Sequence, residues 1–122
     1  MEKLLIAADS QPLTDALMHV LGGRFMIHTC NTGKDLCIEV NRLRPDALIV
    51  GLRLPDGDAF AALEQCQYKP TVIIGITDLM TAEAKRLAAT VGIGALVPIP
   101  CSARYVAELL EQLMMKIPSP EG

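Results

Sequence analysis

The sequence predicts one α/β domain, a doubly wound parallel five-stranded sheet with helices on both faces. Five short apolar runs, at residues 4–8, 25–29, 47–52, 71–76 and 95–97, alternate with five helical patterns. The run at 47–52 is apolar without alternation, which is typical of a parallel strand covered on both faces. Repeated strand–helix units favour a parallel sheet with right-handed crossovers. With 122 residues, of which 51% are hydrophobic, the chain has material for a single core.

Each expected strand is followed by apolar residues at helical spacing. These stripes comprise residues 13, 16, 17, 20 and 21; 36, 40 and 43; 59–66; 84, 87, 88 and 91; and 106, 109, 110, 113 and 114. Ser10, two residues before Pro12, is predicted to cap the first helix, and Thr81 the fourth. Pro55–Asp56–Gly57 predicts a turn between the third strand and its helix.

Composition and charge exclude several classes of protein. The 11 basic and 14 acidic residues give a net charge of -3, and aromatics make up 3%, which disfavours nucleic-acid binding by this domain. No apolar run reaches the roughly 18 residues that span a membrane, and the first residues are not a signal peptide, so we expect a cytoplasmic protein without membrane contact. The four cysteines lack metal-site spacing and are expected to be buried or half-buried free thiols, while His19 and His28 are expected to be structural or solvated.

In a sheet of this kind, function concentrates at the carboxyl ends of the strands. Here those ends fall at residues 8–10, 51–53, 77–78 and 98–100. The segment after the first strand, residues 8–10, has no glycine, which excludes the dinucleotide-binding fingerprint. The sequence also lacks a P-loop. Neither histidine falls at a strand end where it could complete a nucleophilic triad.

The strand ends resemble those of the response-regulator receiver domains of two-component signalling, over about residues 3–115. Segments 3–10, 45–57, 71–77 and 92–100 carry the resemblance, and the spacing from Asp46 through Pro55 is its most specific part. In this family the first strand ends in two acids, the third in the phosphoacceptor aspartate and the fourth in Thr or Ser, and Lys-Pro follows the fifth. The resemblance implies the flavodoxin-like strand order 2-1-3-4-5 and a role in phosphorelay signal transduction.

The family's site positions are degenerate in this chain. They fall on Ala8, Asp9, Gly51, Thr77 and Ile99, so only the second acid and the threonine remain. Gly51 has no side chain to carry an acyl phosphate, and Ile99 cannot donate to phosphoryl oxygens. Asp9 alone supplies too few carboxylate oxygens to hold Mg²⁺ firmly. We therefore predict a pseudo-receiver that has no catalytic residue, is not an enzyme, needs no cofactor and binds Mg²⁺ weakly or not at all.

Two alternatives remain at the sequence level. In one, Asp56 or Asp78 replaces the missing groups of a metal or phosphate site, or phosphate is accepted at Ser10, Asp9 or Asp78; turn geometry explains Asp56 and Asp78 equally, and helix capping explains Ser10. A small-ligand-binding flavodoxin-like domain would use the vacated pocket, which Ala8 and Ile99 make partly apolar.

A receiver-like module that takes no phosphate is expected to act on a protein partner or an output domain. Homodimerisation through the fourth and fifth helices is one such mode, although a solvated face explains their charges equally well. Those charged residues are Glu83, Lys85, Arg86, Arg104, Glu108 and Glu111. The domain is assigned to residues 1–116, and the proline-containing residues 117–122 to the start of a linker or a cloning remnant.

Overall fold

A computed structural model of the chain describes residues 2–78 and 80–115. Its main sheet has five parallel strands in the order β2-β1-β3-β6-β7. These are β1 (Glu2–Ala7), β2 (Phe25–Cys30), β3 (Ala47–Gly51), β6 (Val72–Thr77) and β7 (Ala95–Pro98). In chain order this is 2-1-3-4-5, so the predicted flavodoxin-like fold is confirmed.

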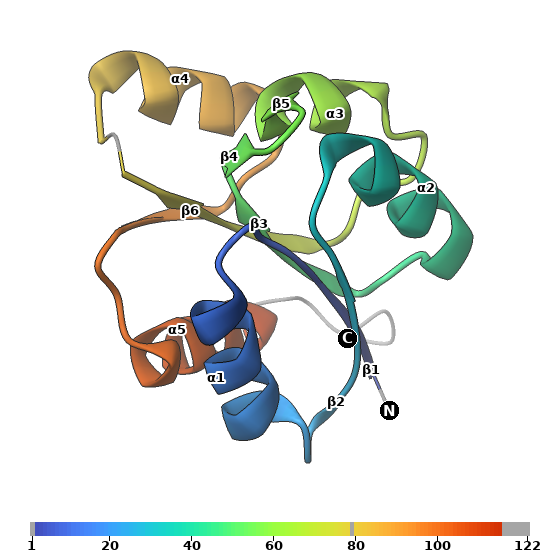
Figure 1. Cartoon of the computed structure of the whole chain (residues 1–122), viewed down its shortest axis with the longest axis vertical. Coiled ribbons are helices and arrows are strands. Elements are labelled where there is room, and N and C mark those ends of the chain that lie inside the picture. The colour runs from blue at the N-terminus through green and yellow to red at the C-terminus, as the bar shows by residue number, and fades with distance from the viewer. Residues whose placement is uncertain (1, 79, 116–122) are drawn as a thin grey trace.

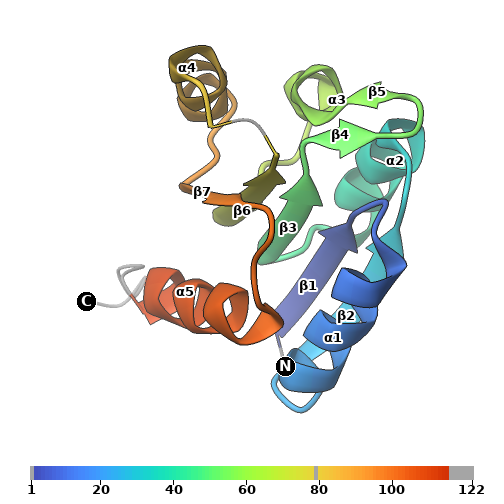
Figure 2. The same cartoon turned by 60° about the vertical axis from the view of Figure 1, so that its left-hand side comes forward.

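Helices cover both faces of the sheet, as predicted (Figure 1). They are α1 (Gln11–Leu21), α2 (Gly33–Leu43), α3 (Ala59–Gln65), α4 (Ala82–Thr90) and α5 (Ala103–Met115). Figures 1 and 2 show α1 and α5 on one face and α2, α3 and α4 on the other. None of the helices described is long and apolar enough to span a bilayer.

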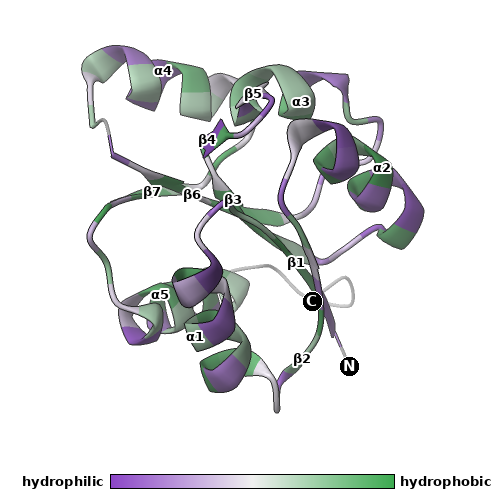
Figure 3. Cartoon of the chain, in the orientation of Figure 1, coloured by the Kyte–Doolittle hydropathy of each residue, from purple (hydrophilic) through white to green (hydrophobic). Residues whose placement is uncertain are grey.

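The core forms two layers, one on each face of the sheet. Alternate residues of one strand enter different layers: Leu4 and Ile6 pack toward α1 and α5, whereas Leu5 and Ala7 pack toward α2 and α3. The strands are hydrophobic along much of their length in Figure 3 because both of their faces are covered. The same burial explains why the sequence showed continuous apolar runs.

The polar face of α1 is rotated from the face that its sequence pattern predicts. Leu13, Leu17 and Leu21 pack inward as expected, but Val20 is 43% exposed, Ala16 is exposed and Thr14 is buried. Thr14 can be buried because its hydroxyl donates to the Ser10 carbonyl over 2.9 Å. A polar residue that satisfies its own hydrogen bond has therefore taken a core position.

A small hairpin was not predicted. The turn at residues 55–57 is present, but it joins two short antiparallel strands, β4 (Arg53–Leu54) and β5 (Gly57–Asp58). The hairpin follows β3 directly and leads into α3 (Figure 2). It therefore places Arg53 beside the carboxyl end of the sheet.

The helix starts behave as predicted. The Ser10 hydroxyl accepts from Leu13 N at 3.4 Å, and the Thr81 hydroxyl accepts from Ala84 N at 3.0 Å. Both positions thus cap α1 and α4. Asp58 caps α3 in the same way through Ala61 N at 3.1 Å.

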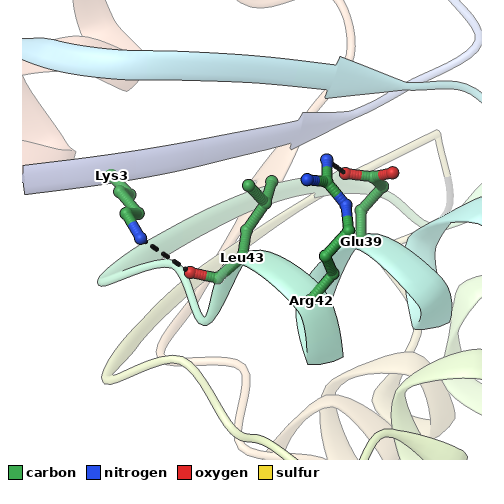
Figure 4. A network of polar contacts seen from close by, with 4 residues as sticks. All are labelled: Lys3, Glu39, Arg42 and Leu43. Atoms are coloured by element: carbon green, nitrogen blue, oxygen red, sulfur yellow. Dashed lines mark hydrogen bonds and ion pairs between the residues drawn. The ribbon is translucent and has the colours of Figure 1, made fainter.

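Hydrogen bonds around Asp46 join the amino ends of β1, β3 and β6. Its carboxylate accepts from Lys3 N at 2.8 Å, its own N–H donates to the Lys3 carbonyl at 2.9 Å, and its carbonyl accepts from Val72 N at 3.3 Å. The Lys3 ammonium also reaches the Leu43 carbonyl at the end of α2, over 3.2 Å (Figure 4). Asp46 therefore has a structural role. It lies at the amino edge of the sheet, opposite the carboxyl ends of the strands.

Two further predictions concern the cysteines and histidines and the end of the domain. All four cysteines are free and are buried or half-buried, as predicted, His19 is exposed and His28 half-buried. The assigned domain end at residue 116 and the expected linker at 117–122 lie outside the described residues.

Candidate functional site

The carboxyl ends of β1, β3 and β6 meet at one edge of the sheet (Figure 2). Residues at these ends border a cleft of about 260 Å³. The five positions singled out from the sequence, Ala8, Asp9, Gly51, Thr77 and Ile99, all line it. The cleft is completed by Ser10, Leu13, Arg53, Ile76 and Asp78. The structure thus brings together residues that are separated by more than ninety positions in the chain.

Gly51 leaves usable room at the floor of this cleft. A Cβ at residue 51 would meet Ala8 Cα at 3.7 Å, with the Ala7 carbonyl oxygen and Ala8 Cβ at 3.8 Å. These are ordinary van der Waals distances. Its φ is not in the left-handed region, so neither crowding nor backbone conformation requires a glycine here.

Gly75, in the neighbouring strand β6, contrasts with Gly51. A Cβ there would lie 2.9 Å from Leu96 Cδ2 and 3.3 Å from both Ile93 Cγ2 and Leu52 Cδ2. Side chains therefore crowd the Cβ position of residue 75 but not that of residue 51. The missing side chain at the end of β3 is a feature of the site rather than of the core.

The two acids of the cleft have different surroundings. Asp78 pairs with Arg53 across the mouth, with 3.2 Å between the carboxylate oxygen and Nη1. Asp9 is exposed and forms no ion pair with any residue in 2–78 or 80–115. Within those same ranges no three His, Cys, Asp or Glu side chains are grouped so as to hold a metal ion.

Ile99 and Thr77 form the side of the cleft nearest β7. Ile99 N donates to the Thr77 carbonyl over 2.9 Å, and the Ile99–Pro100 peptide bond is cis. The Ile99 side chain is exposed at the rim, whereas Thr77 is buried. This side of the cleft therefore presents an apolar surface and no positive charge.

Asp56 lies away from the cleft and has a structural role beyond the turn that the sequence predicts. Its carboxylate accepts from Gly33 N at 2.7 Å and from Lys34 N at 3.1 Å, at the start of α2. These N–H groups, Gly33 first, lower the pKa of Asp56 below its usual value. The residue therefore joins the hairpin turn to α2.

A second cleft, of about 270 Å³, adjoins the first between the β4–α3 segment and α4. Arg53, Thr77 and Asp78 line both clefts. Sequence reasoning identified neither this cleft nor the role of Arg53. The only available signal was a basic residue two positions after Gly51 at a strand end.

Burial raises the pKa of three of the four cysteines. Burial, aided by the Asp35 and Glu39 carboxylates, raises the pKa of Cys30 to about 12. Burial, aided by the neighbouring Cys37, raises the pKa of Cys66 to about 12, and burial also raises the pKa of Cys101. Since the thiolate is the reactive form, a raised pKa lowers the reactivity of these three thiols at neutral pH.

Comparison with known proteins identifies the fold. No protein-family model matches the sequence, and no curated protein matches it. Among solved structures, the non-phosphorylated receiver domain of HemR from Leptospira biflexa is similar with a TM-score of 0.84 at 19% identity, covering 98% of each chain. The chemotaxis response regulator CheY4 of Vibrio cholerae gives 0.81 at 23% identity, covering 93% of this chain and 98% of its own. The response regulator domain of Thermotoga maritima CheB gives 0.77 at 20% identity, covering 98% and 99%. The chain therefore has the fold of the response-regulator receiver domains.

Proposed function

We propose that this chain is a receiver-like signalling module that takes no phosphate and acts through contact with other proteins. It is not an enzyme in this proposal, it requires no cofactor or Mg²⁺, and it works in the cytoplasm on a partner or an output domain. The receiver fold supports the signalling role. The composition of the strand-end cleft supports independence from phosphate.

One observation carries the proposal: Gly51 stands at the end of the central strand β3, where a side chain would enter the cleft. A phosphoacceptor must supply an oxygen that bonds to phosphorus, and glycine supplies none. The surrounding residues fit the same interpretation. The side chains of Ala8 and Ile99 offer neither an oxygen ligand for Mg²⁺ nor a cation for phosphoryl oxygens.

The alternative, an atypical acceptor, has three candidates in or beside the cleft. The Ser10 hydroxyl is engaged at the start of α1, and Asp78 is paired with Arg53. Asp9 is the remaining carboxylate, and the other acid of the cleft, Asp78, is held by Arg53 rather than free to share a Mg²⁺ ion with it. The observed bonds therefore favour structural roles for Ser10 and Asp78.

The contact surface in this proposal is formed by α4 and α5, through which two copies would pair. Glu83, Lys85, Arg86, Arg104 and Glu108 are exposed there, and Tyr105 is 54% exposed. Glu111 of α5 also belongs to the expected set, and it pairs with Arg24 in the segment between α1 and β2. Mixed charges around an exposed aromatic are suited to a polar protein interface.

Phosphorylation tests the first part of the proposal. The chain is incubated with acetyl phosphate and Mg²⁺, and its intact mass is measured beside that of the triple variant Ala8→Asp, Gly51→Asp, Ile99→Lys. We expect no added phosphoryl group on the natural chain and Mg²⁺-dependent addition to the variant. Stoichiometric addition to the natural chain at Asp9, Ser10 or Asp78 would establish the atypical acceptor instead. A variant that stays unmodified would show that the site positions are misassigned, while the fold stands.

Self-association tests the second part. Sedimentation of the chain is compared with that of Tyr105→Glu on α5 and of a matched control, Ile38→Glu on α2. Ile38 is 50% exposed, close to the 54% of Tyr105. We expect only the Tyr105 variant to reduce dimer formation. Equal behaviour of both variants would remove α5 from the interface.

A further inference from the structure

Two clefts at the carboxyl edge of the sheet share a wall. The strand-end cleft, of about 260 Å³, and the α3–α4 cleft, of about 270 Å³, are both lined by Arg53, Thr77 and Asp78. Sites for drug-sized molecules usually occupy roughly 300–1,000 Å³. Each cleft alone falls short of that range, whereas the two joined fall within it.

Two of the three residues that the clefts share form an exposed ion pair. The 3.2 Å contact between Arg53 and Asp78 joins side chains that are 70% and 50% exposed. Exposed ion pairs contribute little to stability because water solvates both partners when they separate. A ligand can therefore displace this contact at small cost.

Both clefts have apolar walls. Ile76, Leu13 and Ile99 line the first, and Leu52, Phe60 and Leu87 line the second. Apolar walls on either side of one polar contact suit an elongated apolar molecule that passes between them.

The charge of the two clefts is negative. Four carboxylates, those of Asp9, Asp58, Asp78 and Glu83, face one guanidinium, that of Arg53. Asp58 caps α3 and Asp78 pairs with Arg53, but Asp9 and Glu83 form no ion pair within 2–78 and 80–115. The unpaired carboxylates thus lie one in each cleft. This excess of negative charge attracts a cation, and the apolar walls beside it suit an organic one.

We propose that the two clefts form one binding groove, that its ligand is an elongated apolar molecule with a single ammonium group, and that the ligand displaces the Arg53–Asp78 contact. This inference goes beyond the signalling role and does not rest on it. The ammonium lies against Asp9 in the strand-end cleft, and the apolar body passes the displaced pair into the α3–α4 cleft.

The test uses n-butylamine, n-hexylamine and n-octylamine, with the alcohols of the same lengths as neutral controls. Binding is followed through the backbone amide resonances of the full chain. Butylamine is expected to shift Gly51 and Ile99, whereas octylamine also shifts Phe60 and Leu87. Affinity should rise about fourfold for each methylene that becomes buried, the equivalent of about 0.8 kcal/mol. Each amine should bind up to about fivefold more tightly than its alcohol, as an exposed ion pair allows.

Three variants decide the assignment. Asp9→Asn should reduce binding of the amines to that of the alcohols. Arg53→Met, which removes the ion pair and its positive charge from both clefts, should strengthen binding of octylamine more than that of butylamine. Glu64→Gln, an exposed change on α3 outside both clefts, should alter neither. Equal binding of amines and alcohols, an unchanged Asp9 variant, or octylamine shifts confined to the strand-end cleft would each overturn the proposal.

Discussion

Alanine at Gly51 and alanine at Gly75 test whether the strand-end cleft is vacant for functional rather than packing reasons. At residue 51 the added methyl meets only contacts of 3.7–3.8 Å, so no neighbour has to move. Replacing glycine in a compatible backbone stabilises a protein by about 0.4–1 kcal/mol, because the unfolded chain loses freedom. We therefore expect Gly51→Ala to leave the free energy of unfolding unchanged or to raise it by up to about 1 kcal/mol.

At residue 75 the same methyl meets Leu96 at 2.9 Å and both Ile93 and Leu52 at 3.3 Å. Leu96 is flexible at its end, but the other two contacts come from buried side chains. Overpacking of this kind costs about 1–3 kcal/mol, so we expect Gly75→Ala to lose about 1–2 kcal/mol after the chain-entropy gain.

Urea unfolding followed by far-ultraviolet circular dichroism measures both variants, since the chain has no tryptophan to report on its folding. The expected separation between the two free energies of unfolding is about 2 kcal/mol. If Gly51→Ala is destabilised as much as Gly75→Ala, then glycine at the end of β3 is a packing requirement. The vacancy at residue 51 would then reflect packing of the fold and not the function of the cleft.

Three further outcomes are expected. The folded pKa of Asp56 lies below its unfolded value, so its stabilising contribution is present at neutral pH and is lost as the pH falls through the folded pKa. Asp56→Asn should accordingly reduce the stability difference between neutral pH and about pH 3, measured by urea unfolding, and an unchanged difference would contradict the contact with α2. Iodoacetamide should modify Cys30 and Cys66 slowly in the folded chain and rapidly in urea, and fast labelling of the folded chain would contradict their raised pKa values. Thr81→Ala should lower the free energy of unfolding by about 1 kcal/mol and Ser10→Ala by about half of that. The reason is that the capping bond from Leu13 N to the Ser10 hydroxyl is longer, at 3.4 Å, than the bond from Ala84 N to the Thr81 hydroxyl, at 3.0 Å. Equal losses would show that the length of the capping bond does not set the cost.

The fold was accessible from sequence because its signals are local. Continuous apolar runs mark the buried strands, and Ser10 and Thr81 mark helix starts through side chains that bond within three residues. The inward face of α1 was predicted less well, because periodicity counts threonine as polar. Thr14 is buried by bonding to the backbone of its own helix, which a hydropathy pattern does not register.

The site was accessible only in part. Convergence of Ala8, Gly51 and Thr77 follows from parallel strands that end at one edge, so strand positions suffice to predict it. The Arg53–Asp78 pair depends on how an unpredicted hairpin turns after β3, and the second cleft depends on how α4 packs beside α3. The bond from Asp56 to α2 spans more than twenty residues, and no local pattern carries it.

Asp46 has a consequence for redesign of this domain. Its three backbone and side-chain hydrogen bonds join β1, β3 and β6 at their amino ends. None of these bonds involves a residue that lines the strand-end cleft. Mutations at the carboxyl ends of the strands therefore leave the hydrogen bonds of Asp46 intact. The effects of mutations at such distant sites on the free energy of unfolding are nearly additive. The domain is consequently a permissive scaffold, in which new chemistry can be installed stepwise at one end while the other end preserves the architecture.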